Sequence, residues 1–117
     1  MYKKNSGRQG EDQAAAALES AGMEIIARNF RSKYGEIDII ALTGDVIIFV
    51  EVKAWSVFGI EDLQYGIDIK KQRKIIKTAK YFLLENRKYS RMAIRFDVVF
   101  IKNNSVTHLA SAFTERV

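Results

Sequence analysis

Four ionisable side chains interrupt two otherwise apolar stretches of this 117-residue chain. Glu36 and Asp38 interrupt the first stretch, and Glu51 and Lys53 interrupt the second. An unpaired charge is costly to bury, so these groups require water, mutual pairing or a metal ion. Carboxylates with a nearby ammonium form a site for Mg²⁺ or Mn²⁺ that suits hydrolysis of a phosphodiester, in which the lysine positions the attacking water.

The two stretches are predicted to be strands that pair as a hairpin. Residues 36–42 and 46–53 are rich in β-branched and aromatic residues, and Gly44 between them is typical of a tight turn. Side chains alternate faces along a strand, so the four ionisable groups share one face only if the turn has an even length. We predict a two-residue turn, Thr43-Gly44 or Gly44-Asp45, or a bulge that restores the same pairing.

Several short motifs accompany this hairpin in a fixed order. They are Gly10-Glu11, Gly35-Glu36-Ile37-Asp38, Phe49-Val50-Glu51-Val52-Lys53, Lys71-Gln72 and Arg95-Phe96-Asp97. Together they resemble the small bacterial YraN-like family over nearly the whole chain. The hairpin also resembles the D…(D/E)-x-K signature of the restriction-endonuclease-like nucleases, which include archaeal Holliday-junction resolvases. The chain departs from these families at Ile37, where many nucleases carry proline, and at Ala54-Trp55, where relatives often carry polar or basic residues.

The resemblance implies a role for each acidic position. Asp38 and Glu51 are expected to bind the metal ion, Lys53 to orient the water, and Glu36 to be an auxiliary acid and ligand. Glu11 lies on the inward stripe of a predicted helix and is expected to be a further acid of the site, although a first-turn glutamate with its carboxylate in water is the alternative. Gln72 is expected near the site, with a core amide bonded to backbone as the alternative.

The segment from Asp68 to about Tyr89 is predicted to be the longest helix, with Asp68 as its N-cap. Its outward faces are almost entirely basic, with Glu85 as the one acid, and this imbalance favours contact with a phosphate backbone over a merely solvated face. Arg31 and Lys33, near Asp38, either bind phosphate or are solvated charges. The residues predicted to bind nucleic acid are Lys70, Lys71, Arg73, Lys74, Lys77, Arg31 and Lys33.

Composition also favours a nucleic-acid partner, and it excludes disulfide-bonded and thiolate metal-binding proteins. The net charge of +5 favours a polyanion, and the absence of cysteine excludes disulfides and thiolate metal sites. No apolar run approaches the roughly 20 residues that span a bilayer, and the N-terminal residues lack the apolar core of a signal peptide. We expect a cytoplasmic protein with no membrane partner.

The order of predicted elements indicates a single α/β (α+β) domain over residues 1–117. A mobile lead-in, Met1 to Gln9, precedes a helix from Gly10 to Ala21 and a strand from Met23 to Phe30. After the hairpin and the long helix come strands 93–101 and 106–109 and a frayed tail, 110–117. Because the central strands are apolar on both sides, we predict a mixed central β-sheet flanked by helices on both faces. The resemblance makes this a restriction-endonuclease-like αβββαβ core.

Three other features carry weaker predictions. Arg95 and Asp97 share a strand face and are predicted to form a structural pair, and His108, the only histidine, is given no role. The segment Ala54 to Ile67 carries large apolar residues without periodicity. It packs in the core, meets a second subunit in a homodimer, or stacks on a nucleic-acid base.

The sequence therefore supports two main hypotheses of function. The first is a metal-dependent endonuclease that acts on DNA, with Mg²⁺ or Mn²⁺ as cofactor. The second is a non-catalytic nucleic-acid-binding module or adaptor that retains the nuclease fold. A third is an inert charge network, which would bind neither metal nor DNA.

Overall fold

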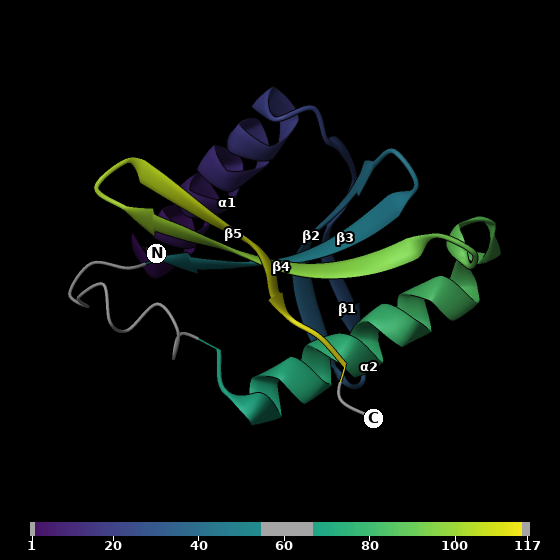
Figure 1. The fold of residues 1–117 in the computed structure, drawn as a ribbon. Coiled ribbons are helices and arrows are strands. Elements are labelled where there is room, and N and C mark those ends of the chain that lie inside the picture. The colour runs from purple at the N-terminus through teal and green to yellow at the C-terminus, as the bar shows by residue number, and fades with distance from the viewer. Residues whose placement is uncertain (1, 55–66, 116–117) are drawn as a thin grey trace.

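The structure is a computed structural model of one chain, and it describes residues 2–54 and 67–115, with side chains from residue 9 onward. The described residues form two helices, five strands and one short 3₁₀ turn (Figure 1). In chain order these elements are α1 (Tyr2–Ser20), β1 (Glu24–Ser32), β2 (Gly35–Thr43), β3 (Val46–Ala54), α2 (Ile69–Glu85), η2 (Arg87–Tyr89), β4 (Ala93–Lys102) and β5 (Ser105–Phe113).

The strands form one mixed sheet in the order β1-β2-β3-β4-β5. Strands β1, β2 and β3 form an antiparallel meander. Helix α2 then carries the chain across to β4, which lies parallel to β3, and β5 returns antiparallel at the edge. The predicted element order and the mixed sheet are confirmed.

Each face of the sheet is covered by one helix, which is why the central strands are apolar on both sides. Helix α1 packs Ala14, Ala15 and Leu18 against Ile39, Ile48, Val50, Val99 and Ile101. Helix α2 packs Ile75, Ile76, Ala79 and Phe82 against the other face, around Ile40, Phe49 and Phe96. In Figure 1 the two helices accordingly lie on opposite sides of the sheet. The predicted arrangement of helices on both faces is confirmed.

The β2–β3 hairpin has the predicted two-residue turn. Thr43 pairs with Val46, so Gly44 and Asp45 form the turn. Gly44 has a φ of 55°, which glycine adopts without steric cost. This register makes Asp38 and Glu51 the next opposed positions after the pair Ile39–Val50.

Helix α1 begins eight residues earlier than predicted, at Tyr2 instead of Gly10. Residues 2–9 carry no apolar stripe, but they extend a helix that is already fixed by its packed part, and propagation is much cheaper than nucleation. Gly10 is buried, and a Cβ there would lie 3.8 Å from Ile101. The prediction of a mobile lead-in was therefore wrong for residues 2–9.

Strand β5 is longer than the predicted strand 106–109, and the predicted fraying of residues 110–113 was wrong. Phe113 pairs with Phe96 after an irregularity opposite Asp97, and the two rings stack with centroids 5.1 Å apart. These contacts are to residues distant in sequence, which no local pattern in the tail reveals.

The predictions for Ala54 to Ile67 fall mainly on residues 55–66, which lie outside the described part of the chain. At its end, Ile67 is buried in the core beneath α2. Neither described helix, α1 or α2, is long and apolar enough to span a bilayer.

Candidate acidic site between strands β2 and β3

Asp38 lies where β2 separates from β3. The backbone ladder between the two strands ends at Ile39 and Val50. Beyond it, the Asp38 carboxylate takes the place of a backbone partner and accepts a hydrogen bond of 2.7 Å from the Val52 N–H. The side chain is thereby held at the fork between the strands, next to Glu51.

Glu51 is almost fully buried and binds a lysine of helix α2. Its side chain is 7% exposed, and its Oε2 lies 2.5 Å from the Nζ of Lys71. Burial lowers the pKa of Lys71, but the hydrogen bond and charge of Glu51 and the charge of Asp38 outweigh it, so the net pKa is raised. Lys71 is therefore a firmly charged partner of the acid pair.

The charge of Glu51 acts on the neighbouring Asp38 carboxyl group. Burial, and next the charge of Glu51, raise the pKa of Asp38 to about 8, although the Val52 N–H acts in the opposite direction. A single lysine thus leaves this pair of acids short of positive charge.

A cavity of about 250 Å³ opens over the acid pair. It is lined by Gly35, Glu36, Asp38, Glu51, Lys71, Lys74 and Ile75. Gly35 brings the start of β2 close to α2, since a Cβ there would lie 3.4 Å from the Thr78 hydroxyl and 3.5 Å from the Lys74 Cβ. The cavity is therefore walled by β2 and β3 on one side and by the first turns of α2 on the other.

The auxiliary acids are near this pair but have basic partners. Glu11 is close enough to raise the pKa of Asp38 slightly, and its Oε1 lies 3.5 Å from Arg28. Glu36 lines the cavity, and its carboxylate accepts a hydrogen bond of 3.1 Å from Arg31. Arg31, predicted to bind nucleic acid, is thus occupied by Glu36.

Three predicted catalytic residues, Glu11, Lys53 and Gln72, lie outside the lining of the cavity. Lys53 shares a face of β3 with Glu51 by alternation, but there β3 pairs with β4 and has left β2. Gln72 donates its side-chain amide to the Ile67 carbonyl at 3.0 Å, which is the backbone-bonded alternative. The structure brings Asp38, Glu51, Glu36 and Lys71 together, whereas Gln72 faces a different hollow.

The sequence matches a family model described as "Uncharacterised protein family UPF0102" over residues 10–101. The chain belongs to the UPF0102 family. It is 43% identical to a UPF0102 protein of Persephonella marina over 97% of each chain. It is 46% identical to one of Sulfurihydrogenibium sp., over 97% of this chain and 98% of the relative. It is 41% identical to a third UPF0102 protein, from Treponema denticola, over 92% of this chain and 93% of the relative. The YraN-like resemblance is therefore confirmed, and the family description assigns no activity.

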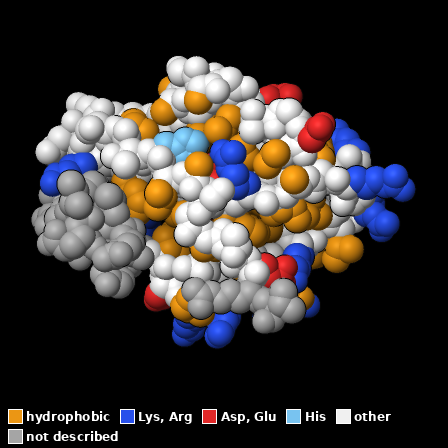
Figure 2. Space-filling model, in the orientation of Figure 1, with side chains coloured by type: hydrophobic (Ala, Val, Ile, Leu, Met, Phe, Trp, Pro, Cys, Tyr) orange, Lys and Arg blue, Asp and Glu red, His pale blue; other side chains and the backbone are white. Residues whose placement is uncertain are grey.

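In this UPF0102 protein a basic surface borders the acidic cavity. Lys74 lines the cavity, and Lys77, one turn further along α2, is exposed and lies 5.9 Å from the centre of the Tyr34 ring. Lys33 lies 5.3 Å from the same ring. Figure 2 shows Lys and Arg side chains gathered along the lower margin and at the right-hand end, where Figure 1 places α2 and the turn after it.

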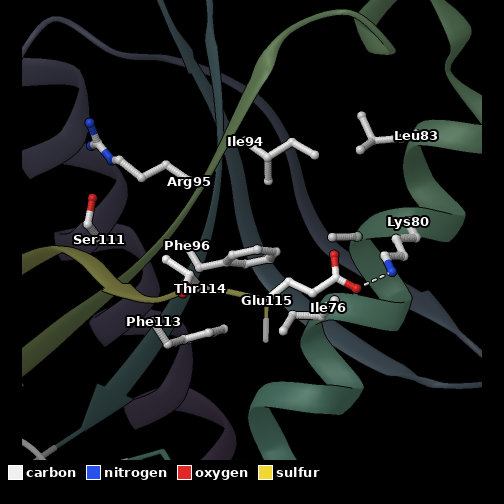
Figure 3. A pocket seen from close by; sticks show the side chains of 11 residues that line it. Ile76, Lys80, Leu83, Ile94, Arg95, Phe96, Ser111, Phe113, Thr114 and Glu115 are labelled. Carbon is white, nitrogen blue, oxygen red and sulfur yellow. Dashed lines mark hydrogen bonds and ion pairs between the residues drawn. The ribbon is translucent and has the colours of Figure 1, made fainter. Parts of the chain in front are cut away.

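A second hollow lies between α2 and the end of β5 (Figure 3). Ile76, Leu83, Ile94, Phe96 and Phe113 make it largely apolar, and Glu115 forms an ion pair with Lys80 across it. Arg73, Lys77 and Gln72 line the adjoining hollow of about 400 Å³. Lys71 and Lys74 of α2 therefore line the acidic cavity, whereas Arg73, Lys77 and Lys80 line the apolar groove and the hollow beside it.

Asp97, on β4, is a second buried carboxylate with a different environment. It is fully buried and accepts hydrogen bonds from Arg95 at 2.9 and 2.8 Å and from the Ser111 N–H at 3.0 Å, with the His108 Nε2 at 2.7 Å. In Figure 3 Arg95 accordingly extends toward Ser111, away from the α2 side of the groove. Burial raises the pKa of Asp97, but these donors outweigh it, so the net pKa is lowered.

The predicted Arg95–Asp97 pair is confirmed, and the sequence analysis missed the contact with His108. The alternation of faces gives a signal for it, because His108 pairs with Val99, two residues beyond Asp97 on the same face of β4. Since Asp97 and Arg95 are each other's partners, we interpret this cluster as structural.

The acid pair suits Mg²⁺ or Mn²⁺ by its chemistry. Both cations prefer oxygen ligands, and two adjacent carboxylates with one pKa raised to about 8 favour additional positive charge. Among residues 2–54 and 67–115 no three acidic or histidine side chains converge as a ligand group, and the part of Glu36 as a third ligand stays a prediction. Mg²⁺ is commonly held by one or two carboxylates together with water and substrate phosphate, and Asp38 and Glu51 fit that pattern.

Proposed function

We propose that this protein is a metal-dependent nuclease that binds DNA and hydrolyses a phosphodiester at the Asp38–Glu51 site. The observation that carries the proposal is the position of this acid pair, in a cavity whose basic wall continues onto the exposed face of α2. Carboxylates that can bind a cation lie there next to lysines that can bind phosphate, as phosphodiester hydrolysis requires. The UPF0102 relatives carry no functional name, so the activity rests on the site itself.

Each residue has a role that follows from its position. Asp38 and Glu51 would hold Mg²⁺ or Mn²⁺, with Asp38 fixed in place by the Val52 N–H. The bound cation supplies positive charge that stabilises a phosphoryl group under attack by water. Glu11 adds negative charge beside Asp38, and Glu36 lies on the wall of the cavity.

The basic groups would hold the DNA backbone over the cavity. Lys74 and Lys77 lie along one side of α2, and Lys33 approaches from the β1–β2 turn. Lys53 does not line the cavity, but it lies two residues beyond Glu51 on the same face of β3, and we assign it to orient the attacking water. Contacts of this kind give affinity that falls steeply with added salt.

The decisive experiment is a cleavage assay with matched variants. Purified protein is incubated with Mg²⁺ or Mn²⁺ and with supercoiled, single-stranded or four-way-junction DNA. We expect cleavage of at least one substrate, abolished by EDTA. Because a catalytic cation contributes several kcal/mol to transition-state stabilisation, Asp38→Asn should lower the rate by about a hundredfold or more. Lys53→Ala should also slow cleavage.

The control is Glu19→Gln, which removes an exposed acid of α1 and should leave the rate unchanged. Equal cleavage by wild type and Asp38→Asn would refute the proposed site. If no substrate is cleaved but DNA binds equally well in EDTA, the protein is the non-catalytic nucleic-acid-binding module. This second candidate is favoured by the basic surface of α2 alone.

A further inference from the structure

Lys71 occupies an inward position of helix α2 that would ordinarily be apolar. Residues 71, 75, 78 and 82 follow helical spacing, and Ile75, Thr78 and Phe82 on this stripe are all buried. At the first turn the stripe passes beyond the core and over the acidic cavity. The side chain of Lys71 is still 44% exposed, so it reaches from solvent down to Glu51.

The neighbouring lysines do not make this contact. Lys70 points to solvent, and Lys74 lines the cavity without an ion pair to any residue in the described ranges. Of the lysines and arginines whose side chains the structure describes, Lys71 alone forms an ion pair with Glu51, and the 2.5 Å separation is that of a short, charge-assisted hydrogen bond. Among the residues that the structure describes, Lys71 is therefore the cationic group that is ion-paired with the acid pair.

We infer that Lys71 is the built-in counter-ion of the Asp38–Glu51 pair, and that Mg²⁺ or Mn²⁺ must displace its ammonium from Glu51 in order to bind. The inference rests on the proposed metal site. The Glu51 carboxylate carries a single negative charge, so the ammonium bound to it and a divalent cation compete for that charge and repel each other at close range. Lys71 is thus a positioning residue that offsets the charge of the acid pair before the metal ion binds and competes with that ion for Glu51.

Displacement leaves Lys71 well placed for a second contact. Helix α2 fixes its backbone at the wall of the cavity, beside Lys74. The released ammonium therefore stays at the mouth of the cavity, where a substrate phosphate is expected. Replacement of the Lys71 ammonium by the metal ion at Glu51 would then free this ammonium to bind the substrate phosphate.

Calorimetric titration of the metal-free protein with Mn²⁺ tests this inference without DNA. Lys71→Met keeps the aliphatic stem and removes the charge, so Mn²⁺ should bind about tenfold more tightly or better, since a charge-assisted hydrogen bond no longer competes. Lys70→Met, the matched control on the exposed neighbour, should change the affinity by less than about twofold. Equal or weaker Mn²⁺ binding by Lys71→Met would overturn the inference, and a purely structural lysine would lower stability without tightening Mn²⁺ binding.

A second measurement uses the wild-type protein and does not depend on how a variant folds. The side-chain ammonium of Lys71 is observed by ¹H–¹⁵N NMR while Mg²⁺ is added. We expect its signal to move or disappear as the site fills, and an unchanged signal at saturating Mg²⁺ would refute displacement.

Failure of the inference and failure of the proposed function are distinguishable. If wild type cleaves DNA but Lys71→Met binds Mn²⁺ no more tightly, only the inference fails. If Lys71→Met binds more tightly but no variant cleaves DNA, only the nuclease function fails. If neither wild type nor Lys71→Met binds Mn²⁺, both are wrong.

Discussion

Asp38 is half-buried and Asp97 fully buried in the same sheet, yet their surroundings shift the pKa of the two carboxyl groups in opposite directions. Asp97 receives hydrogen bonds from Arg95, His108 and the Ser111 N–H, and its pKa is lowered. Asp38 receives one backbone hydrogen bond and faces Glu51, and its pKa is raised to about 8.

This difference separates a structural acid from a candidate functional one. A fully satisfied carboxylate gains nothing from a further ligand, because every oxygen already has donors. An acid held beside another acid is destabilising by itself, and it is retained where something else supplies positive charge. By this criterion the Asp38 site, and not the Asp97 cluster, is expected to bind a cation.

The largest expected effect is loss of stability on removing the Asp97 charge. Asp97→Asn leaves Arg95 without its buried partner and directs amide hydrogens at existing donors, so we expect a loss of about 3–5 kcal/mol in the free energy of unfolding. Urea unfolding at neutral pH measures it. Asp12→Asn, which removes an exposed acid whose oxygen lies 2.7 Å from Arg28, is the control and should cost less than about 1 kcal/mol. Equal losses in the two variants would contradict the structural assignment.

The second prediction concerns the dependence of stability on pH, and here the substitution is expected to stabilise the folded protein. The pKa of Asp38 is raised from 3.8 to about 8 on folding, so between these values the folded protein binds more protons at Asp38 than the unfolded chain does. This group therefore makes the folded state less stable as pH rises through the window. Asp38→Asn, whose amide oxygen can still accept the Val52 N–H, should become progressively more stable relative to wild type from about pH 4 to about pH 8.

The measurement is urea unfolding at several pH values in EDTA, so that no divalent cation interferes. Asp45→Asn, in the exposed β2–β3 turn, should track wild type across the same range. A stability difference between Asp38→Asn and wild type that stays constant with pH would show that Asp38 is not held in a charge-poor site.

The smallest effect is expected at the rim of the cavity. The Glu36 and Arg31 side chains are 37% and 75% exposed, so water screens their ion pair and Glu36→Gln should cost less than about 1 kcal/mol in stability. Thermal or urea unfolding checks this value. A larger loss would place Glu36 with the buried acids and support it as a third member of the site.

Sequence reasoning captured what depends on local pattern. The two apolar runs predicted the hairpin, Gly44 predicted its turn, and side-chain alternation predicted that Asp38 and Glu51 share a face. Asp68 was recognised as an N-cap, and it accepts the Lys71 N–H at 2.8 Å. These features follow from side-chain period and backbone geometry within short segments.

The remaining features depend on contacts between distant segments. The extension of α1 to Tyr2 and of β5 to Phe113 was missed because packing, and not local sequence, holds those ends. Lys71 was predicted to contact DNA, but its ammonium lies on Glu51, twenty positions earlier in the chain.

The sequence alone determined which residue types are available and, through the period of each element, which of them share a face. Only the tertiary structure decided that β2 and β3 separate at Asp38, that α2 crosses above the fork, and that one acid is crowded by a second acid while another is surrounded by donors. The physical reason is that charge balance depends on distances of a few ångströms between segments that are remote in sequence, and the packing of the core sets those distances.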